Sequence, residues 1–111
     1  ALVFPDGLGQ RQGWNAGFVD LSGQKKDDVK FMAQIMDQMG AWVPIDPDRI
    51  FMCGHSNGAF MSHFAATQLS DRIAAIGAVA GTTGIGQRHI PALPAGAKVS
   101  VLMIHAKNDA T

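Results

Sequence analysis

The sequence predicts an α/β fold in which helices flank a mostly parallel sheet. Short apolar runs of strand length alternate with segments of helical periodicity, the pattern typical of strands that are covered by helices. Turn-forming Gly, Pro and Asp residues separate these segments. Apolar residues make up 47% of the chain and charged residues 16%, a balance typical of a segment with a packed core. With 111 residues, the chain forms at most one domain.

The N-terminal quarter predicts one strand and one long loop. Residues 1–4 form an apolar run that predicts a short strand, and Pro5-Asp6-Gly7 ends it with turn-forming residues. Residues 5–24 are rich in glycine and show little periodicity, so we expect a loop. Loops of this length often carry function.

Residues 25–40 predict the first helix. Its apolar side chains recur at spacings of three and four residues, which places them on one face: Val29, Met32, Ile35, Met36 and Met39. Asp27 and Asp28 suit the first turn, because the N-terminal end of a helix is electropositive. Gly40 suits the end of this helix.

The rest of the chain predicts three strands and a second helix. Apolar runs of strand length occupy residues 49–53, 73–80 and 99–104. Residues 57–69 carry an apolar face at helical spacing. Residues 81–97 connect the last two strands and have no clear helical period.

The segment Gly54-His55-Ser56-Asn57-Gly58 fits the pattern G-x-S-x-G between a predicted strand and a predicted helix. In this setting a nucleophilic serine stands at the tip of a strained turn, and glycines two positions before and after it relieve crowding. The N-terminal end of the following helix favours negative charge, and the Asn57 N–H is the natural donor to an oxyanion. Ser56 is therefore the predicted nucleophile. The alternative is an ordinary turn in which Ser56 only caps the helix.

The candidate for a catalytic acid is Asp109. Because the sequence contains no Glu, the acid must be an aspartate, and only Asp71 and Asp109 follow Ser56 in the chain order that this type of turn favours. The carboxyl ends of parallel strands share one edge of a sheet. Asp109 follows a predicted strand and lies on the Ser56 edge, whereas Asp71 precedes a strand and lies on the opposite edge. The alternative for Asp109 is a solvated turn aspartate.

The general base is not evident. In this chain order the histidine follows the acid, and after Asp109 come only two further residues, neither of them a histidine. The chain contains His55, His63, His89 and His105. The side chain of His55 should point away from Ser56 because the turn is so tight, and His63 lies two turns into a helix. His89 and His105 are the least unfavourable, and we expect the base to lie beyond residue 111.

Composition gives little support to several other classes of function. Nine basic side chains balance nine acidic ones, so there is no electrostatic reason to expect a nucleic-acid or acidic-membrane partner. No run of 18 apolar residues predicts a transmembrane helix. No clustering of Cys, His and Asp predicts a metal site, and we expect no cofactor. The single Cys53 cannot form an internal disulfide and is expected to be a small buried residue.

Six segments together carry a resemblance to a known family. They are Val3-Phe4-Pro5-Asp6-Gly7, Trp14-Asn15, Asp27-Asp28-Val29-Lys30-Phe31, Ile45-Asp46-Pro47-Asp48-Arg49-Ile50, Gly54-His55-Ser56-Asn57-Gly58 and Ile104-His105-Ala106-Lys107-Asn108-Asp109. In this order, over nearly the whole chain, the sequence resembles polyhydroxybutyrate depolymerase-like and feruloyl esterase-like α/β-hydrolases. It departs from them at Ala106, where a glycine is usual.

The resemblance implies that residues 1–111 are a partial α/β-hydrolase domain, truncated at both ends. It implies that Ser56 is the nucleophile, that Asp109 is the triad acid and that Asn57 provides an oxyanion N–H. An upstream strand with a His-Gly oxyanion loop and a downstream histidine would lie outside the chain. The related enzymes are often exported, which implies an extracellular location.

The implied reaction is hydrolysis of a small or polymeric carboxylic ester through an acyl-enzyme, of the depolymerase or the feruloyl or acetyl esterase type. Trp14 lies in the loop that leaves the catalytic edge, and it either forms part of the substrate wall or anchors the loop on the core. A serine peptidase on the same scaffold and a non-catalytic relic or pseudoenzyme are the alternatives. We expect two exposed sheet edges, a helix-free sheet face and negligible esterase activity in the isolated 111 residues.

Overall fold

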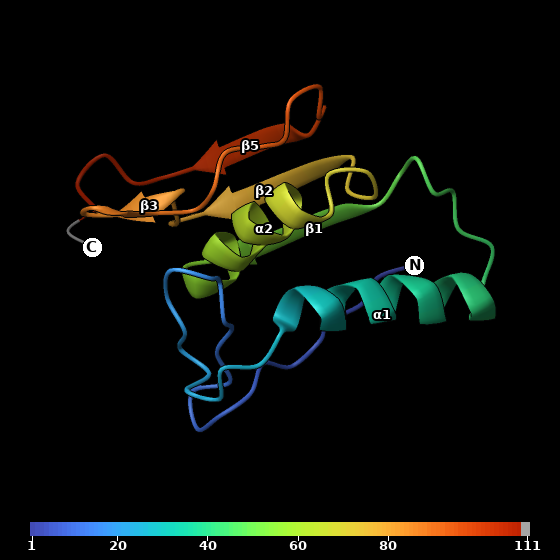
Figure 1. Cartoon of the computed structure of the whole chain (residues 1–111), viewed down its shortest axis with the longest axis horizontal. Helices are drawn as coiled ribbons and strands as arrows, with labels where there is room; N and C mark the ends of the chain where they lie inside the picture. The colour runs from blue at the N-terminus through green and yellow to red at the C-terminus, as the bar shows by residue number, and fades with distance from the viewer. Residues whose placement is uncertain (110–111) are drawn as a thin grey trace.

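The computed structural model describes residues 1–109, and its central element is a three-stranded parallel sheet (Figure 1). The strands are β1 (Phe51–His55), β2 (Ala75–Val79) and β5 (Ser100–Ile104), in the order β1-β2-β5. Together with its flanking helices, this parallel sheet confirms the predicted α/β fold class. Two short strands, β3 (Gly84–Ile85) and β4 (Arg88–His89), form a separate antiparallel hairpin within the connection over residues 81–97.

The two helices form successive layers on one side of the sheet (Figure 1). Helix α2 (Asn57–Gln68) packs against β1 and β2, and α1 (Asp28–Trp42) packs against α2. The Asp27 side chain caps α1 by accepting a hydrogen bond from the Lys30 N–H at 2.9 Å. The helix runs past Gly40, its predicted end, and stops before Pro44, which restricts the residue that precedes it.

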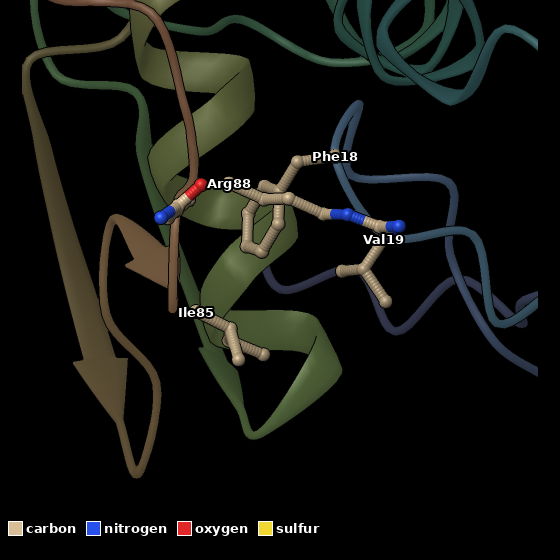
Figure 2. A pocket seen from close by; sticks show the side chains of 5 residues that line it. Phe18, Val19, Ile85 and Arg88 are labelled. Atoms are coloured by element: carbon tan, nitrogen blue, oxygen red, sulfur yellow. The ribbon is translucent and has the colours of Figure 1, made fainter.

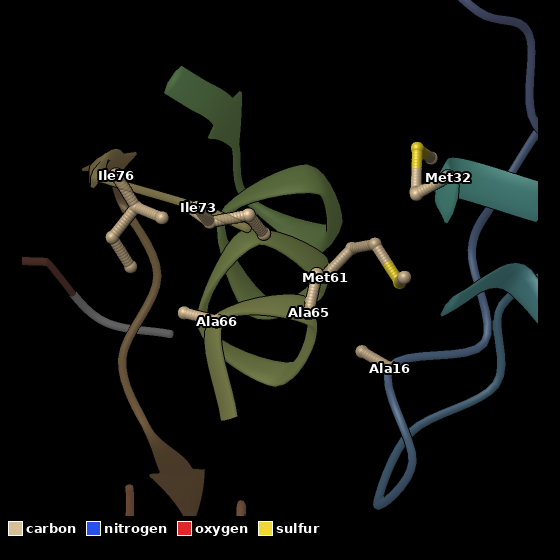
Figure 3. Packing of buried hydrophobic residues seen from close by; sticks show 7 residues of the cluster. All are labelled: Ala16, Met32, Met61, Ala65, Ala66, Ile73 and Ile76. Carbon is tan, nitrogen blue, oxygen red and sulfur yellow. The ribbon is translucent and has the colours of Figure 1, made fainter. Parts of the chain in front are cut away.

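The hydrophobic core surrounds α2, because this helix lies between the sheet and α1. Figure 3 shows the Met61 side chain extending from α2 toward Met32 of α1 and Ala16 of the N-terminal loop. Ile73 and Ile76 pack on the sheet side of the same cluster. Small residues on α2 allow this close approach from several sides: Ala59, Ala65 and Ala66 are all buried.

The opposite face of the sheet is not covered by any described helix. In β1, Phe51 and Cys53 are exposed, whereas Met52 between them is partly buried on the α2 side. Leu102 of β5, which shares the uncovered face with Cys53 through the strand register, is 63% exposed. The expectation that Cys53 is buried is therefore wrong, because alternation along β1 directs its side chain away from α2. The helix-free face was expected and is present.

The strand predicted over residues 1–4 is not formed. Leu2 and Phe4 are each 86% exposed, and no described strand pairs with this segment. An apolar run becomes a strand only when a neighbouring strand accepts its backbone hydrogen bonds and another layer covers its side chains. Neither condition is met here among residues 1–109, so the apolar run alone is insufficient.

Candidate active site

Ser56 occupies the turn between β1 and α2 in an unusual backbone conformation. Its φ and ψ angles are 53° and −114°, outside the regions that non-glycine residues ordinarily adopt. Such a conformation costs on the order of 1–3 kcal/mol and persists only where the surroundings enforce it. Here the Ser56 N–H donates to the Val79 carbonyl at 2.8 Å, and the Ser56 carbonyl accepts from Ala59 and Phe60 at 2.9 and 3.1 Å.

The Ser56 side chain does not cap α2. Ser56 occupies the N-cap position, but its hydroxyl makes no capping hydrogen bond to the helix. Because the residue is exposed at the end of β1, the hydroxyl stands at the carboxyl edge of the sheet. The alternative in which Ser56 acts only as a helix cap is therefore not supported.

Two glycines allow this turn to close. A Cβ atom on Gly54 would lie 2.3 Å from both the carbonyl carbon and the oxygen of Gly58, closer than real Cβ atoms approach. A Cβ atom on Gly81, which follows β2, would lie 2.5 Å from the Ala59 Cβ and 2.9 Å from the backbone carbonyl oxygen of Ser56. Gly58 itself has open space around its missing Cβ. The predicted need for glycine thus holds at Gly54 and not at Gly58, and the sequence pattern did not identify Gly81.

Asn57 connects the turn to the N-terminal loop through its side chain. The Asn57 Oδ1 accepts a hydrogen bond from the Trp14 N–H at 2.7 Å, and Nδ2 donates to the Trp14 carbonyl at 3.2 Å. The backbone N–H of Asn57 belongs to the first residue of α2 and has no acceptor one turn earlier in the helix. Asn57 therefore has two separable features, a side chain that holds the loop and an N–H that remains available at the helix start.

Trp14 lies against the core. Its ring is partly buried, packs against the hydrophobic cluster and stacks on Phe31 with centroids 6.4 Å apart. Its backbone also pairs with Asn57, as described above. This packing fits the loop-anchor alternative, and the substrate-binding role of Trp14 stays a prediction.

Asp109 lies on the same edge of the sheet as Ser56. In the parallel register, His55 at the end of β1 is aligned with Val79 of β2 and Ile104 of β5. Both Ser56 and Asp109 follow the carboxyl ends of their strands, and β2 lies between those strands. The two strands are thus two strand spacings apart, about 9–10 Å in the hydrogen-bonding direction. Asp109 lies five residues beyond Ile104, the end of β5. The structure brings His105 to Asp109, with 3.3 Å between Nε2 and Oδ2 and 15% of the Asp109 side chain exposed.

None of the four histidines forms a hydrogen bond with Ser56 in the described part of the chain. His55 and His89 are exposed on strands, and His105 contacts Asp109. His63 is buried in α2, and its Nε2 has no hydrogen-bond partner. Burial lowers the pKa of His63, because the charged imidazolium would lose its hydration.

A cavity of about 330 Å³ lies between the N-terminal loop and the β3–β4 hairpin (Figure 2). It is lined by Phe18, Val19, Ile85, Gln87 and Arg88. None of these residues was singled out from the sequence, because the two segments that carry them are distant in the chain and show no periodic pattern. Within residues 1–109, no group of three or more His, Cys or Asp side chains is arranged to hold a metal ion. No helix in that part of the chain is both long and apolar enough to cross a bilayer.

Comparisons with known proteins identify esterases. The chain is 30% identical over 108 residues, or 97% of its length, to a bifunctional acetylxylan esterase/xylanase of Neocallimastix patriciarum. It is 38% identical over 64 residues, or 58% of its length, to feruloyl esterase B of Piromyces equi. The chain spans only 14% and 11% of the lengths of these two proteins. No protein-family model and no solved structure matches it. These similarities relate the chain to the esterases, enzymes that hydrolyse carboxylic esters.

Proposed function

We propose that this chain is part of a serine esterase in which Ser56 attacks the carbonyl carbon of a carboxylic ester. The observation that carries the proposal is the strained, exposed Ser56 turn at the carboxyl edge of the sheet, where an N–H at the helix start remains available. Backbone strain in a non-glycine residue occurs preferentially at functional sites. The esterase names of the two relatives favour an ester over an amide substrate.

In the proposed reaction, negative charge develops on the carbonyl oxygen of the ester. Attack by the Ser56 hydroxyl, whose proton passes to the base, converts the carbonyl oxygen into an oxyanion, and the Asn57 N–H donates a hydrogen bond to it. The base returns this proton to the departing alcohol oxygen. The positive end of the α2 dipole stabilises the same charge. Collapse of the tetrahedral intermediate breaks the ester bond, releases the alcohol and leaves an acyl group on Ser56. Water then attacks this acyl group and releases the acid.

Asp109 is proposed to orient the base and to stabilise its protonated form. The strands that precede Ser56 and Asp109 are two strand spacings apart, about 9–10 Å, which is longer than a direct hydrogen bond. In the proposed arrangement one imidazole bonds to both groups. His105 presents Nε2 to Asp109, so only Nδ1, the nitrogen next to its own backbone, would remain for Ser56. We therefore propose that the base is a histidine from another part of the parent protein.

The proposed substrates are acyl esters of the acetyl or feruloyl type, following the names of the relatives, or polyester chains, following the depolymerase resemblance. Residues 1–111 are proposed to be one portion of a larger hydrolase domain, because the relatives are several times longer. An extracellular location is proposed from the family resemblance.

A fluorophosphonate probe, which reacts covalently with activated serines, tests the assignment in the full-length protein. We expect labelling and turnover of 4-nitrophenyl acetate, and both should be lost in Ser56→Ala. Ser70→Ala, a change beyond the end of α2, is the matched control and should be labelled normally. Labelling that persists in Ser56→Ala would contradict the proposal. A 4-nitroanilide of the same acyl group distinguishes esterase from peptidase activity.

A further inference from the structure

The cavity between the loop and the hairpin has one wall that is attached directly to the Ser56 turn. Phe18 packs edge-on against Phe60, with ring centroids 5.4 Å apart and an interplanar angle of 72°. Phe60 lies in the first turn of α2, and its N–H donates to the Ser56 carbonyl at 3.1 Å. Phe60 therefore contacts both Phe18 in the cavity wall and the backbone of Ser56, the proposed nucleophile.

The other wall, formed by the hairpin, is connected to the same turn through Gly81. The hairpin follows β2, and Gly81, between β2 and the hairpin, is in close contact with Ala59 and the Ser56 carbonyl. Ile85 comes four residues after Gly81, so its Cα lies within about 14 Å of Gly81. Figure 2 shows the Arg88 side chain extending from the hairpin past Phe18 toward Val19 of the N-terminal loop. Both walls are thus connected, through Phe60 and through Gly81, to residues that contact the Ser56 backbone.

The lining combines an apolar surface with one cation. Phe18, Val19 and Ile85 supply the apolar part, and 48% of Ile85 remains exposed. The volume of about 330 Å³ is at the lower end of the range for small-molecule sites, roughly 300–1,000 Å³. Among residues 1–109 no acidic side chain pairs with Arg88, whereas Arg72 is paired with Asp37 at 2.7 Å. A guanidinium presents parallel N–H donors that match the two oxygens of a carboxylate.

We propose that this cavity binds the part of the ester remote from the scissile bond, and that Arg88 makes the enzyme prefer esters whose apolar portion carries a carboxylate. The inference rests on the proposed function and adds a substrate class to it. Gln87, beside Arg88 in the lining, supplies a further amide donor for the same carboxylate. The carboxylate belongs to the acyl part or to the alcohol part of the ester, and two pairs of substrates distinguish these sources.

The experiment uses the full-length protein and esters that differ only in a terminal carboxylate. One pair consists of the 4-nitrophenyl monoester of adipic acid and 4-nitrophenyl hexanoate. The other pair consists of acetyl esters of 6-hydroxyhexanoate and of hexanol. In at least one pair, Arg88→Met should raise the KM of the charged ester about three- to tenfold, because the guanidinium is exposed and its attraction is partly screened. The KM of the neutral partner should change by less than about twofold, and Arg88→Lys should retain part of the preference.

Two further variants test whether the change in KM arises at this cavity. Arg49→Met removes an exposed arginine that precedes β1 at the opposite edge of the sheet, and it should leave the charged-to-neutral ratio unchanged. Ile85→Ala should raise KM for both members of the sensitive pair alike, because it shortens the apolar wall. If Arg88→Met leaves the ratio unchanged in both pairs while turnover still requires Ser56, the inference is wrong and the proposed function stands. If no ester is turned over, or turnover survives Ser56→Ala, the proposed function fails and this inference fails with it.

Discussion

The Ser56 turn and the Asp109 turn lie on the same edge of the sheet, but they are held in place very differently. Three backbone hydrogen bonds fix Ser56, and the close packing at Gly54 and Gly81 leaves no room for a Cβ atom at either position. Asp109 follows β5, a strand that is exposed on both faces, and its own N–H bonds to Ala106 in a short turn at 3.2 Å. The backbone of Ser56 is thus held by close packing on several sides, whereas Asp109 follows a sparsely packed strand and contacts His105.

The difference has a physical origin in how far α2 extends over the sheet. The helix packs on β1 and β2, so it covers one face of the strand that leads to Ser56. Met103 of β5, which the strand register places on the α2 side, is still 50% exposed. We therefore expect substitutions near Ser56 to have large effects on stability and substitutions near Asp109 to have small ones.

The largest effect is expected at Gly54. Gly54→Ala places a Cβ atom 2.3 Å from backbone atoms of Gly58, which cannot move aside as a flexible side chain could. The free energy of unfolding should fall by at least about 3 kcal/mol, the upper part of the range for overpacking. The midpoint of urea denaturation measures this loss. Gly58→Ala is the matched control, because its Cβ meets open space. That variant should be neutral or more stable by up to about 1 kcal/mol, as alanine favours a helix.

The next effect is expected at Asn57, which holds the loop against the turn. Asn57→Ala removes both hydrogen bonds to Trp14 and should lower stability by about 1–3 kcal/mol, because the Trp14 N–H loses its acceptor. The Trp14 carbonyl keeps the hydrogen bond from the Leu21 N–H at 3.2 Å. Asn57→Asp retains an acceptor for the Trp14 N–H but no donor for its carbonyl, so its loss should be smaller. Amide hydrogen exchange at Trp14 reports the change directly. Unaltered protection of that amide in Asn57→Ala would show that the side chain does not hold the loop.

The third prediction concerns pH and the buried side of α2. Burial holds the pKa of His63 below the ordinary value of about 6.5. Between the folded pKa and about pH 6.5, the unfolded chain therefore binds more protons than the folded chain. Stability contributed by the neutral imidazole is present above about pH 6.5 and is lost as the pH falls below it.

His63→Leu should reduce this pH dependence and remove the buried Nε2 that has no partner. Urea denaturation at pH 7.5 and pH 5 measures both effects. His55→Leu changes an exposed histidine and should leave the dependence of stability on pH unchanged. An identical loss of stability at pH 5 in the unmodified protein and in His63→Leu would argue against a role for His63.

The smallest effect is expected at the Asp109 turn. His105→Ala removes a contact between two groups that remain partly accessible to solvent, with 38% and 15% of their side chains exposed. Such pairs contribute little, and the free energy of unfolding should change by less than about 0.5 kcal/mol. A loss comparable to that in Asn57→Ala would erase the contrast between the two turns. It would mean that the Asp109 turn is as firmly held as the serine turn.

Much of the fold and the Ser56 turn could be predicted from the sequence because their signals are local. Helical spacing of apolar residues identified both helices, and Asp27 caps α1 in the position that its side chain favours. The glycine pattern around Ser56 predicted a sharp turn between a strand and a helix, and the positive φ of Ser56 agrees with it. These features depend on neighbours within a few residues, and the chain specifies those neighbours directly.

Other features were decided only by the tertiary structure. Residues 1–4 carry a strand pattern but find no partner strand, and Cys53 is exposed because no described layer covers its face. The contacts of Gly81 with Ser56 and of Asn57 with Trp14 join segments that no local pattern relates. Backbone preference is a property of neighbouring residues, whereas burial and long-range contact depend on which surfaces meet. The sequence by itself therefore determined both helices, the three strands of the parallel sheet and the serine turn, and the packing of distant segments decided what surrounds them.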